Sequence, residues 1–310
     1  MIQQFVERLT NASVVGLDID STFIKAAEVI SLKGQLILRK AVVRAIEKQD
    51  PVLLLKQIMV ENDFKTTHVA LGLASPEVIV HPFQFPRMPK KELAGAIRLE
   101  AEHAVLNGHV PDKMAVDWHR LDSRSENLVR GLLAVVPKEI ISAQIQTAKS
   151  AGLVPVVVDV KGLALWNVYW ALAGSKEPEP KTVLLIYMGD QSTHVVIAKG
   201  PDELILVRDI EIGVEGFHKN QKSEWVSEIY DSVVYARSKS RLRALASAYV
   251  TGGGALFPEI LKTLESQLAI SVKGWNPLEH IARDAGSKTF PSSNGPMMAI
   301  AMGLALRSRQ

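Results

Sequence analysis

The sequence predicts an α/β protein made of two related lobes with a cleft between them. The chain has 310 residues, a length that suits about two domains. It opens with three short apolar strands and a helix, and three similar strands return after a polar, proline-rich stretch at residues 174–180. The first strand of each run ends near Asp18 and Tyr187. The second run therefore reads as a duplication of the first.

Composition excludes several classes of protein. Lysine and arginine number 36 against 33 acidic residues, and this balance argues against a large nucleic-acid-binding surface. The absence of cysteine excludes disulfides, thiolate metal sites and a cysteine nucleophile. No apolar run reaches the roughly 18–20 residues of a membrane span, and the first residues lack the pattern of a signal peptide. We therefore expect a cytoplasmic protein that binds no nucleic acid.

The first nine residues carry apolar side chains at helical spacing, namely Ile2, Phe5, Val6 and Leu9. Such a stripe has two interpretations: a helix lying on a membrane surface, or a short helix docked on this protein or a partner. A stripe this short gives little membrane affinity, which favours docking.

The first half of the chain is expected to alternate strands and helices. Apolar runs bounded by turn residues predict strands at residues 14–18, 23–30, 35–43, 68–73, 77–85, 114–121, 128–136 and 154–160. Apolar residues at helical spacing predict helices at residues 51–62, 89–106, 138–151 and 162–172. Pro89 suits the first turn of its helix, and Gly152 suits the cap after the third.

The second half repeats the opening pattern. Strands are expected at residues 183–188, 193–199, 203–209 and 248–251. Helices are expected at residues 222–240, 256–268 and 296–308.

The turn after the first strand is one candidate ligand site. Asp20, Ser21 and Thr22 follow a strand that ends at Asp18, and Lys25 comes shortly after. Backbone N–H groups in such a tight turn can hold phosphate oxygens, and an acid at the end of the strand can hold Mg²⁺. Asp18 is therefore the candidate metal ligand. An ordinary polar hairpin is the alternative interpretation.

A second candidate lies at Gly252, Gly253 and Gly254, between an apolar strand and a helix. Three glycines allow a ligand to approach the backbone closely. The alternative is a turn that only packs the strand against the helix. The eight histidines show no paired metal-binding spacing.

In this order, these segments resemble the actin-like ATPase superfamily, and more narrowly the pilus assembly protein PilM family. The similar segments cover nearly the whole chain: VVGLDIDSTFIKAAEV, FQFPRMPKKELAGAIRLEAEHAV, AVVPKEIISAQIQTAKSAGLVPVVVDVKGLAL, YMGDQSTHVVIA, LVRDIEIGVEGF, YVTGGGALFPEILKTLESQLAI and MAIAMGLALR. The resemblance implies an actin-like, ribonuclease-H-like fold with an extra subdomain like that of FtsA. The implied division is lobe 1 at residues 1–173 (core 1–66 and 153–173, extra subdomain about 67–152) and lobe 2 at 174–310, with a reduced helical subdomain about 214–246.

The resemblance also assigns nucleotide contacts. They fall on Asp18, Asp20, Ser21, Thr22, Lys25, Lys161, Gly189, Ser192, Thr193, Gly252, Gly253 and Gly254.

Three motifs depart from the family pattern. Asp20 stands where the first phosphate turn has glycine, Tyr187 replaces the aspartate of the second, and Lys161 replaces a glutamate expected to position water. Loss of one well-placed group costs about 10²–10³ in rate. We therefore expect no ATP hydrolysis, while residual binding of ATP and Mg²⁺ stays open. Lys161 could then contact a phosphate as a point charge.

The function implied by the resemblance is that of a scaffold under the inner membrane, within a type IV pilus platform. Its partner would be a PilN-like bitopic membrane protein, whose cytoplasmic N-terminal peptide would bind between the first meander and the extra subdomain. Assembly ATPases of the pilus machine and a second copy of the chain are further candidate partners. Two alternatives stay open: a slow ATPase switch using Asp18 and Asp20 for Mg²⁺, or an actin-like subunit of a type II secretion or other pilus-like system.

Overall fold

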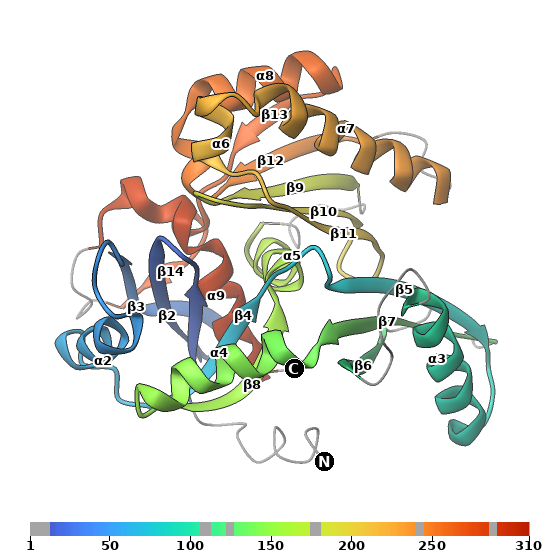
Figure 1. Ribbon diagram of the computed structural model, residues 1–310, viewed down its shortest axis with the longest axis horizontal. Helices are drawn as coiled ribbons and strands as arrows, with labels where there is room; N and C mark the ends of the chain where they lie inside the picture. The colour runs from blue at the N-terminus through green and yellow to red at the C-terminus, as the bar shows by residue number, and fades with distance from the viewer. Residues whose placement is uncertain are drawn as a thin grey trace.

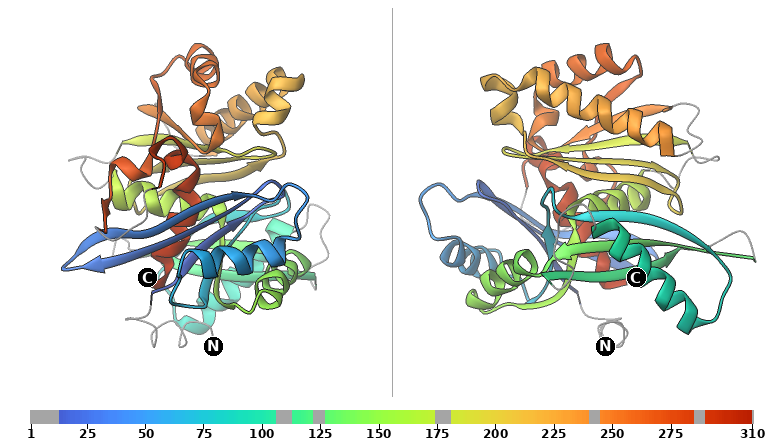
Figure 2. Two further views of the ribbon diagram at one scale, coloured as in Figure 1. Left: turned by 90° about the vertical axis from the view of Figure 1, so that its left-hand side faces the viewer. Right: turned by 45° about the vertical axis from the view of Figure 1, so that its right-hand side comes forward.

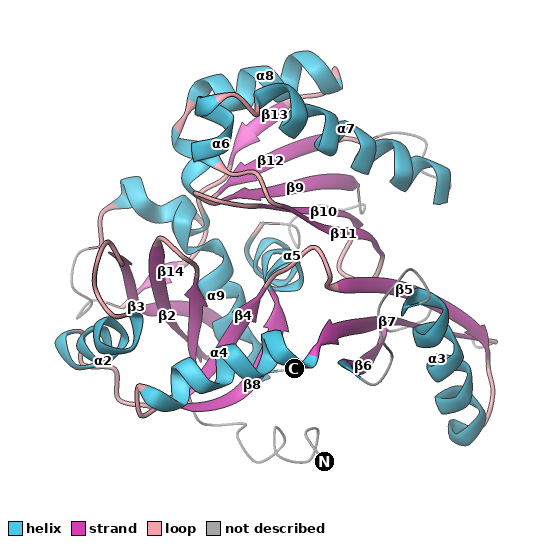
Figure 3. Cartoon of the chain, in the orientation of Figure 1, coloured by secondary structure: helices cyan, strands magenta, loops and turns pink. Residues whose placement is uncertain are grey.

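The computed structural model describes residues 13–105, 113–121, 127–173, 181–239, 245–284 and 290–309. Two large sheets face each other across a pair of central helices, and a third, smaller sheet extends to one side (Figure 1). Helices cover the outer faces of the two large sheets, as the colouring by secondary structure makes clear (Figure 3). The architecture is the two-lobed actin-like fold that the sequence predicts.

The core of lobe 1 is a six-stranded sheet. Its order is β14 (Ala282–Arg283), β3 (Gln35–Ala45), β2 (Phe23–Leu32), β1 (Val15–Ile19), β4 (His68–Leu73) and β8 (Val154–Val160). The strands β1, β2 and β3 form the expected antiparallel meander, and β4 runs parallel to β1. Helices α2 (Pro51–Glu61) and α4 (Lys138–Ser150) cover one face. The carboxylate of Asp50 caps the first turn of α2 by accepting the Val52 N–H.

The extra subdomain is smaller than expected. It consists of β5 (Ile79–Pro86), β6 (Met114–Leu121), β7 (Leu128–Pro137) and α3 (Lys90–Val105). The sheet order is β5-β7-β6, and α3 buries Leu93 and Ile97 against one face of it. The predicted range of 67–152 is too wide, because β4 joins the core sheet and α4 buries Ala148 in the lobe 1 core.

Lobe 2 repeats the strand plan of lobe 1. Its sheet order is β11 (Leu204–Ile210), β10 (Thr193–Lys199), β9 (Thr182–Met188), β12 (Ser247–Thr251) and β13 (Val272–Gly274). An antiparallel meander β9-β10-β11 is followed by the parallel strand β12, as β1-β2-β3 is followed by β4. Helices α6 (Val214–Lys219), α7 (Lys222–Lys239) and α8 (Pro258–Leu268) cover the outer face. Trp225 of α7 is fully buried beneath them.

The two central helices, α5 (Lys161–Leu172) and α9 (Ala299–Ala305), lie between the sheets (Figures 1 and 2). Glycine is required where they pack most closely. A Cβ on Gly16 of β1 would lie 2.0 Å from the Ala301 carbonyl oxygen of α9. A Cβ on Gly303 of α9 would lie 2.0 Å from the Ala164 carbonyl oxygen of α5. Helix α9 therefore packs closely against both β1 of lobe 1 and α5.

The last part of the chain returns to lobe 1. Strand β14 pairs with β3, and α9 packs on β1, so the prediction that all residues after 174 belong to lobe 2 is wrong. The structure also adds α6, β13 and β14, which the sequence analysis did not foresee. The expected final helix at 296–308 is shorter, with 3₁₀ turns at Ser292–Met298 and Leu306–Arg309 on either side of α9. The stretch at 174–180 and the apolar stripe within residues 2–9 lie outside the described residues.

In the part of the chain that the structure describes, no helix combines the length and hydropathy needed to span a bilayer.

Candidate functional site

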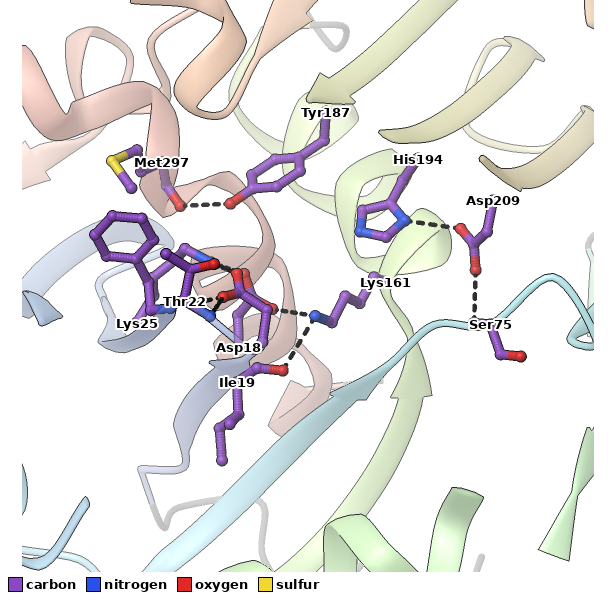
Figure 4. Close-up of polar contacts among 12 residues, drawn as sticks. Asp18, Ile19, Thr22, Lys25, Ser75, Lys161, Tyr187, His194, Asp209 and Met297 are labelled. Atoms are coloured by element: carbon purple, nitrogen blue, oxygen red, sulfur yellow. Dashed lines mark hydrogen bonds and ion pairs between the residues drawn. The ribbon is translucent and has the colours of Figure 1, made fainter. Parts of the chain in front are cut away.

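A buried ion cluster occupies the junction of the two lobes, where β1 ends and α5 begins (Figure 4). Lys25 Nζ lies 3.0 Å from one carboxylate oxygen of Asp18, and Lys161 Nζ lies 2.7 Å from the other. Lys161 also donates to the Ile19 carbonyl oxygen at 3.2 Å. All three charged side chains are buried. Both oxygens of the candidate metal ligand Asp18 are therefore already paired within the protein.

Asp20 closes the turn that follows β1. One of its carboxylate oxygens accepts the backbone N–H groups of Thr22 and Phe23, at 2.8 and 2.6 Å. The other lies 2.5 Å from Lys25 Nζ. Two of the N–H groups that a phosphate would need are thus bound by a carboxylate of the chain itself. Ser21, the remaining residue of this turn, is exposed.

The charges of this cluster balance. Burial would raise the pKa of the Asp18 carboxyl, but the ammonium groups of Lys161 and Lys25 outweigh burial and hold that pKa well below its ordinary value. Burial would lower the pKa of Lys25, yet the carboxylates of Asp18 and Asp20 raise it well above its ordinary value. Two carboxylates therefore face two ammonium groups, so the site lacks the excess positive charge that a polyphosphate would need.

Tyr187, at the end of β9 in lobe 2, lies over the cluster. Its ring centroid is 5.9 Å from Lys25 Nζ, and its hydroxyl donates to the Met297 carbonyl oxygen at 3.3 Å. Burial raises the pKa of the Tyr187 phenol above its ordinary value. The residue that replaces the family's second aspartate is thus a neutral ring packed on a cation.

The turns of the two lobes also contact each other directly. The Thr22 hydroxyl donates to the carboxylate of Asp190 at 2.9 Å, across the junction. In lobe 2, the Gly189 N–H donates to the Ser192 carbonyl oxygen at 2.8 Å and closes its own turn. Asp190 was not foreseen from the sequence, because a polar residue in a hairpin turn carries no distinguishing signal.

Thr193 has a structural environment. Its hydroxyl is buried, donates to the Ile212 carbonyl oxygen at 2.7 Å and accepts the Trp225 indole N–H at 2.9 Å. The first bond ties β10 to the segment between β11 and α6, and the second ties it to α7.

The glycine turn is engaged by its own chain. Gly252 has a φ of 78°, in the region that favours glycine, and its N–H donates to the Pro296 carbonyl oxygen at 3.0 Å. A Cβ on Gly254 would lie 2.6 Å from the Cβ of Met188, so this side chain fills the space beside the turn. Gly253 is more open, since a Cβ there would find its nearest neighbour at 3.8 Å.

A second buried pair lies beside Tyr187. His194 Nδ1 is 2.7 Å from one carboxylate oxygen of Asp209, and the other oxygen accepts the Ser75 backbone N–H at 3.0 Å (Figure 4). The Tyr187 and His194 rings stack at 5.7 Å. This group joins lobe 2 to the segment that leads into the extra subdomain. A histidine inside an otherwise apolar strand was the sequence signal that could have drawn attention to it.

MgATP does not fit the residues gathered here. Both carboxylate oxygens of Asp18 pair with lysines, the first turn folds around Asp20, and the N–H of Gly252 is already bound. Across the described residues, no group of three or more His, Asp or Glu side chains is placed to hold a metal ion. The structure thus brings Asp18, Asp20, Thr22, Lys25 and Lys161 together, but as partners of one another.

Comparison with known proteins agrees with the resemblance read from the sequence. The family model of the type IV pilus assembly protein PilM matches residues 16–225. Among curated proteins, no sequence matches this chain significantly.

Several solved structures are similar to this chain over most of its length. A structure of the PilM–PilN type IV pilus biogenesis complex superposes with a TM-score of 0.76 at 26% identity, over 96% of this chain and 99% of that one. The cytoplasmic domain of EpsL, an inner-membrane component of the type II secretion system of Vibrio cholerae, gives a TM-score of 0.51 at 12% identity, over 96% and 95% of the two chains. An actin-like ATPase-fold protein of unknown function from Bacteroides thetaiotaomicron gives 0.51 at 11% identity, over 94% and 96%. The last two show the shared fold alone.

Since the family model matches more than half of the chain, the protein belongs to the type IV pilus assembly protein PilM family.

Proposed function

We propose that this chain is a scaffold of a type IV pilus assembly platform and that it does not hydrolyse ATP. The observation that carries the second part is the buried cluster of Asp18, Asp20, Lys25 and Lys161. Phosphoryl transfer depends on metal placement and on positive charge held around the phosphates. A cluster whose charges already cancel provides neither.

The proposed partner is the cytoplasmic N-terminal peptide of a PilN-like membrane protein. Support comes from the likeness to the PilM chain of a PilM–PilN complex, which extends over 96% of this chain. The peptide would bind between the β1-β2-β3 meander and the β5-β7-β6 sheet. An extended peptide in such a place gains backbone hydrogen bonds and pockets for alternate side chains. Through this partner the protein would sit at the cytoplasmic face of the inner membrane.

The pilus role is favoured over a role in type II secretion. The EpsL domain shares only 12% identity and a TM-score of 0.51, against 26% and 0.76 for the PilM–PilN complex. The ATPase alternative required Asp18 and Asp20 to hold Mg²⁺, and both carboxylates are bound to lysine instead.

Calorimetry on the purified chain tests both parts of the proposal. A synthetic peptide with the N-terminal sequence of the PilN-like protein from the same genome is expected to bind, and a scrambled peptide is the control. MgATP at millimolar concentration is expected to give no heat, no phosphate release and no change in melting temperature. A ligand at 100 times its Kd stabilises a fold by about 2.7 kcal/mol, so binding would also be visible in a thermal melt.

The experiment can contradict the absence of hydrolysis and the peptide partner independently of each other. Phosphate release above the rate without protein would overturn the proposed absence of hydrolysis and leave the peptide result standing. Equal heats from the native and scrambled peptides would overturn the proposed partner and leave the ATP result standing.

A further inference from the structure

The extra subdomain contacts both lobes. The chain inserts it into lobe 1, between β4 and α4, and β7 runs directly into α4 at Pro137 and Lys138. On the lobe 2 side, β5 packs along β11 (Figure 1). Among the described elements, this is the most extensive contact that the subdomain makes outside itself. Chain connectivity does not require the contact with lobe 2, so the side chains there must account for it.

Asp209 of β11 supplies the polar part of this contact. Its buried carboxylate has one oxygen 2.7 Å from His194 Nδ1, and the other oxygen accepts the Ser75 N–H at 3.0 Å (Figure 4). His194 is itself buried, and its ring stacks on Tyr187. A hydrogen bond to a charged acceptor is strong, and burial strengthens it because water competes little for the carboxylate. Asp209 therefore ties the segment before β5 to lobe 2.

Ser75 determines where β5 begins. Its carbonyl oxygen accepts the Val78 N–H at 3.0 Å, and its hydroxyl accepts the Glu77 N–H at 3.2 Å. Ile79, the first residue of β5, follows directly. The bond from Ser75 to Asp209 thus holds the turn from which β5 enters the extra subdomain.

The extra subdomain has a core of its own. Phe83, Leu93, Ile97 and Leu133 are buried together between its sheet and α3. A unit with its own core can keep its shape while its relation to the rest of the chain changes. Its sheet also adds Val80 to the central apolar core, but that core contains residues of both lobes and favours neither. The contact that distinguishes the lobes is the hydrogen bond to Asp209.

We propose that Asp209 clamps the extra subdomain to lobe 2, so that the two form one rigid body and movement between the lobes occurs against the core of lobe 1. Chain order gives the opposite expectation, because the subdomain is inserted into lobe 1. The clamp does not depend on a partner. One consequence rests on the proposed function: a peptide bound between the β1-β2-β3 meander and the extra subdomain would contact both bodies and fix the lobes relative to each other.

Spin labels can show which lobe the extra subdomain follows. The chain contains no cysteine, so pairs of introduced cysteines carry the only labels. Leu99→Cys on α3, Lys262→Cys on α8 and Val60→Cys on α2 place labels at exposed positions of the extra subdomain, lobe 2 and lobe 1. Electron–electron double resonance should give a distance distribution at least about twofold narrower for the 99–262 pair than for the 60–99 pair. Equal widths, or a narrower distribution for the 60–99 pair, would overturn the proposal.

Variants of Asp209 test the clamp itself, with folding checked by circular dichroism. Asp209→Ala should broaden the 99–262 distribution about twofold or more, and the loss of a hydrogen bond to a charged group should speed hydrogen exchange of the Ser75 amide at least about tenfold. Asp209→Asn keeps an oxygen for the Ser75 N–H, and its amide can donate to neutral His194, so both readouts should stay closer to native. The control is Asp202→Ala, at an exposed position in the turn before β11, which should leave both readouts native.

Two outcomes with these variants would contradict the clamp. One is an Asp209→Ala chain whose readouts match those of Asp202→Ala. The other is faster exchange at Ser75 with an unchanged 99–262 distribution, because the bond would then hold only the local turn. If Asp209→Ala does not fold, the widths measured for the label pairs in the native background still decide the question.

Discussion

Asp18→Asn tests the buried ion cluster most directly. In the native protein, Asp18 is the carboxylate shared by Lys25 and Lys161 at 3.0 and 2.7 Å. Asparagine preserves the shape but removes the carboxylate charge that both buried ammonium groups share, leaving Lys25 paired with Asp20 and Lys161 bound to the Ile19 carbonyl oxygen. Removing one partner of a buried ion pair costs about 3–5 kcal/mol. At roughly 2–4 °C per kcal/mol for a chain of this size, Tm should fall by about 6–20 °C.

Two further variants isolate the cause. Glu61→Gln removes a carboxylate from the exposed pair with Arg44, at 2.7 Å, and should cost no more than about 1 kcal/mol. Adding Lys161→Met to Asp18→Asn removes both members of one buried pair and leaves Lys25 paired with Asp20. Because a buried pair can be replaced by neutral groups at little cost, the double variant should recover most of the lost Tm. Urea denaturation followed by far-ultraviolet circular dichroism gives the corresponding free energies.

The pH dependence has a definite sign. The folded-state pKa of Asp18 is depressed, so its stabilising contribution is complete above the ordinary carboxyl pKa of about 3.9 and is lost as the pH falls below it. The gap in Tm between the native chain and Asp18→Asn should stay constant between about pH 5 and 8 and narrow below about pH 4. A gap no larger than that of Glu61→Gln at pH 7 would refute the description of a charged, buried cluster.

Three other predictions follow from close contacts and buried groups. Gly16→Ala should lower the free energy of unfolding, measured in urea, by at least about 3 kcal/mol, because its Cβ would lie 2.0 Å from a backbone oxygen. The control is Gly95→Ala, at an exposed helix position with no neighbour within 4 Å, which should raise the free energy of unfolding by about 0.5–1 kcal/mol. Equal effects of the two variants would contradict the packing of α9 on β1. Thr22→Val removes the hydrogen bond from the Thr22 hydroxyl to Asp190 and should lower the free energy of unfolding by about 1 kcal/mol. Thr22→Ser keeps a hydroxyl and should stay close to native as the control. A native Tm for the valine variant would show that this hydrogen bond does not stabilise the fold. The folded-state pKa of Tyr187 is raised, so its neutral phenol stabilises the fold below about pH 10 and this contribution is lost as the pH rises further. Between about pH 10 and 12, the Tm of Tyr187→Phe should therefore fall less than the Tm of the native chain. Equal falls in Tm would contradict a raised pKa for Tyr187.

Most of the secondary structure was accessible from the sequence because apolar runs and turn residues mark it locally. The meanders of both lobes are visible in this way, and so is their repetition. Strands β13 and β14 are three and two residues long, too short to leave a periodic pattern. The placement of β14 in lobe 1 depends on pairing with β3, which lies more than two hundred residues earlier in the chain. No local signal carries that information, which is why the boundary at 174 misassigned the C-terminal segment.

The candidate site was predictable as a set of positions but not as an arrangement. The sequence marks Asp18, Asp20, Lys25 and Lys161 as ligand candidates because of their residue types and their places in family motifs. It cannot show that Lys161 reaches back across 142 residues to the Ile19 carbonyl. A lysine at that position can bind a phosphate or pair with an aspartate, and the sequence is the same in both cases. The distances in the structure are needed to tell the two roles apart.

The contacts between the two lobes also limit how a nucleotide could regulate the protein. The lobes are joined at their junction by contacts from the chain itself, through Thr22 to Asp190 and through the Tyr187 ring over Lys25. Each such contact contributes about 1 kcal/mol, in addition to the close packing of the central helices. A ligand shifts an equilibrium between conformations only by its differential affinity for them. If MgATP has no affinity for this junction, nucleotide cannot set the relation between the lobes. Under the proposed scaffold role, control would then act where the partner binds, through the supply of the membrane peptide.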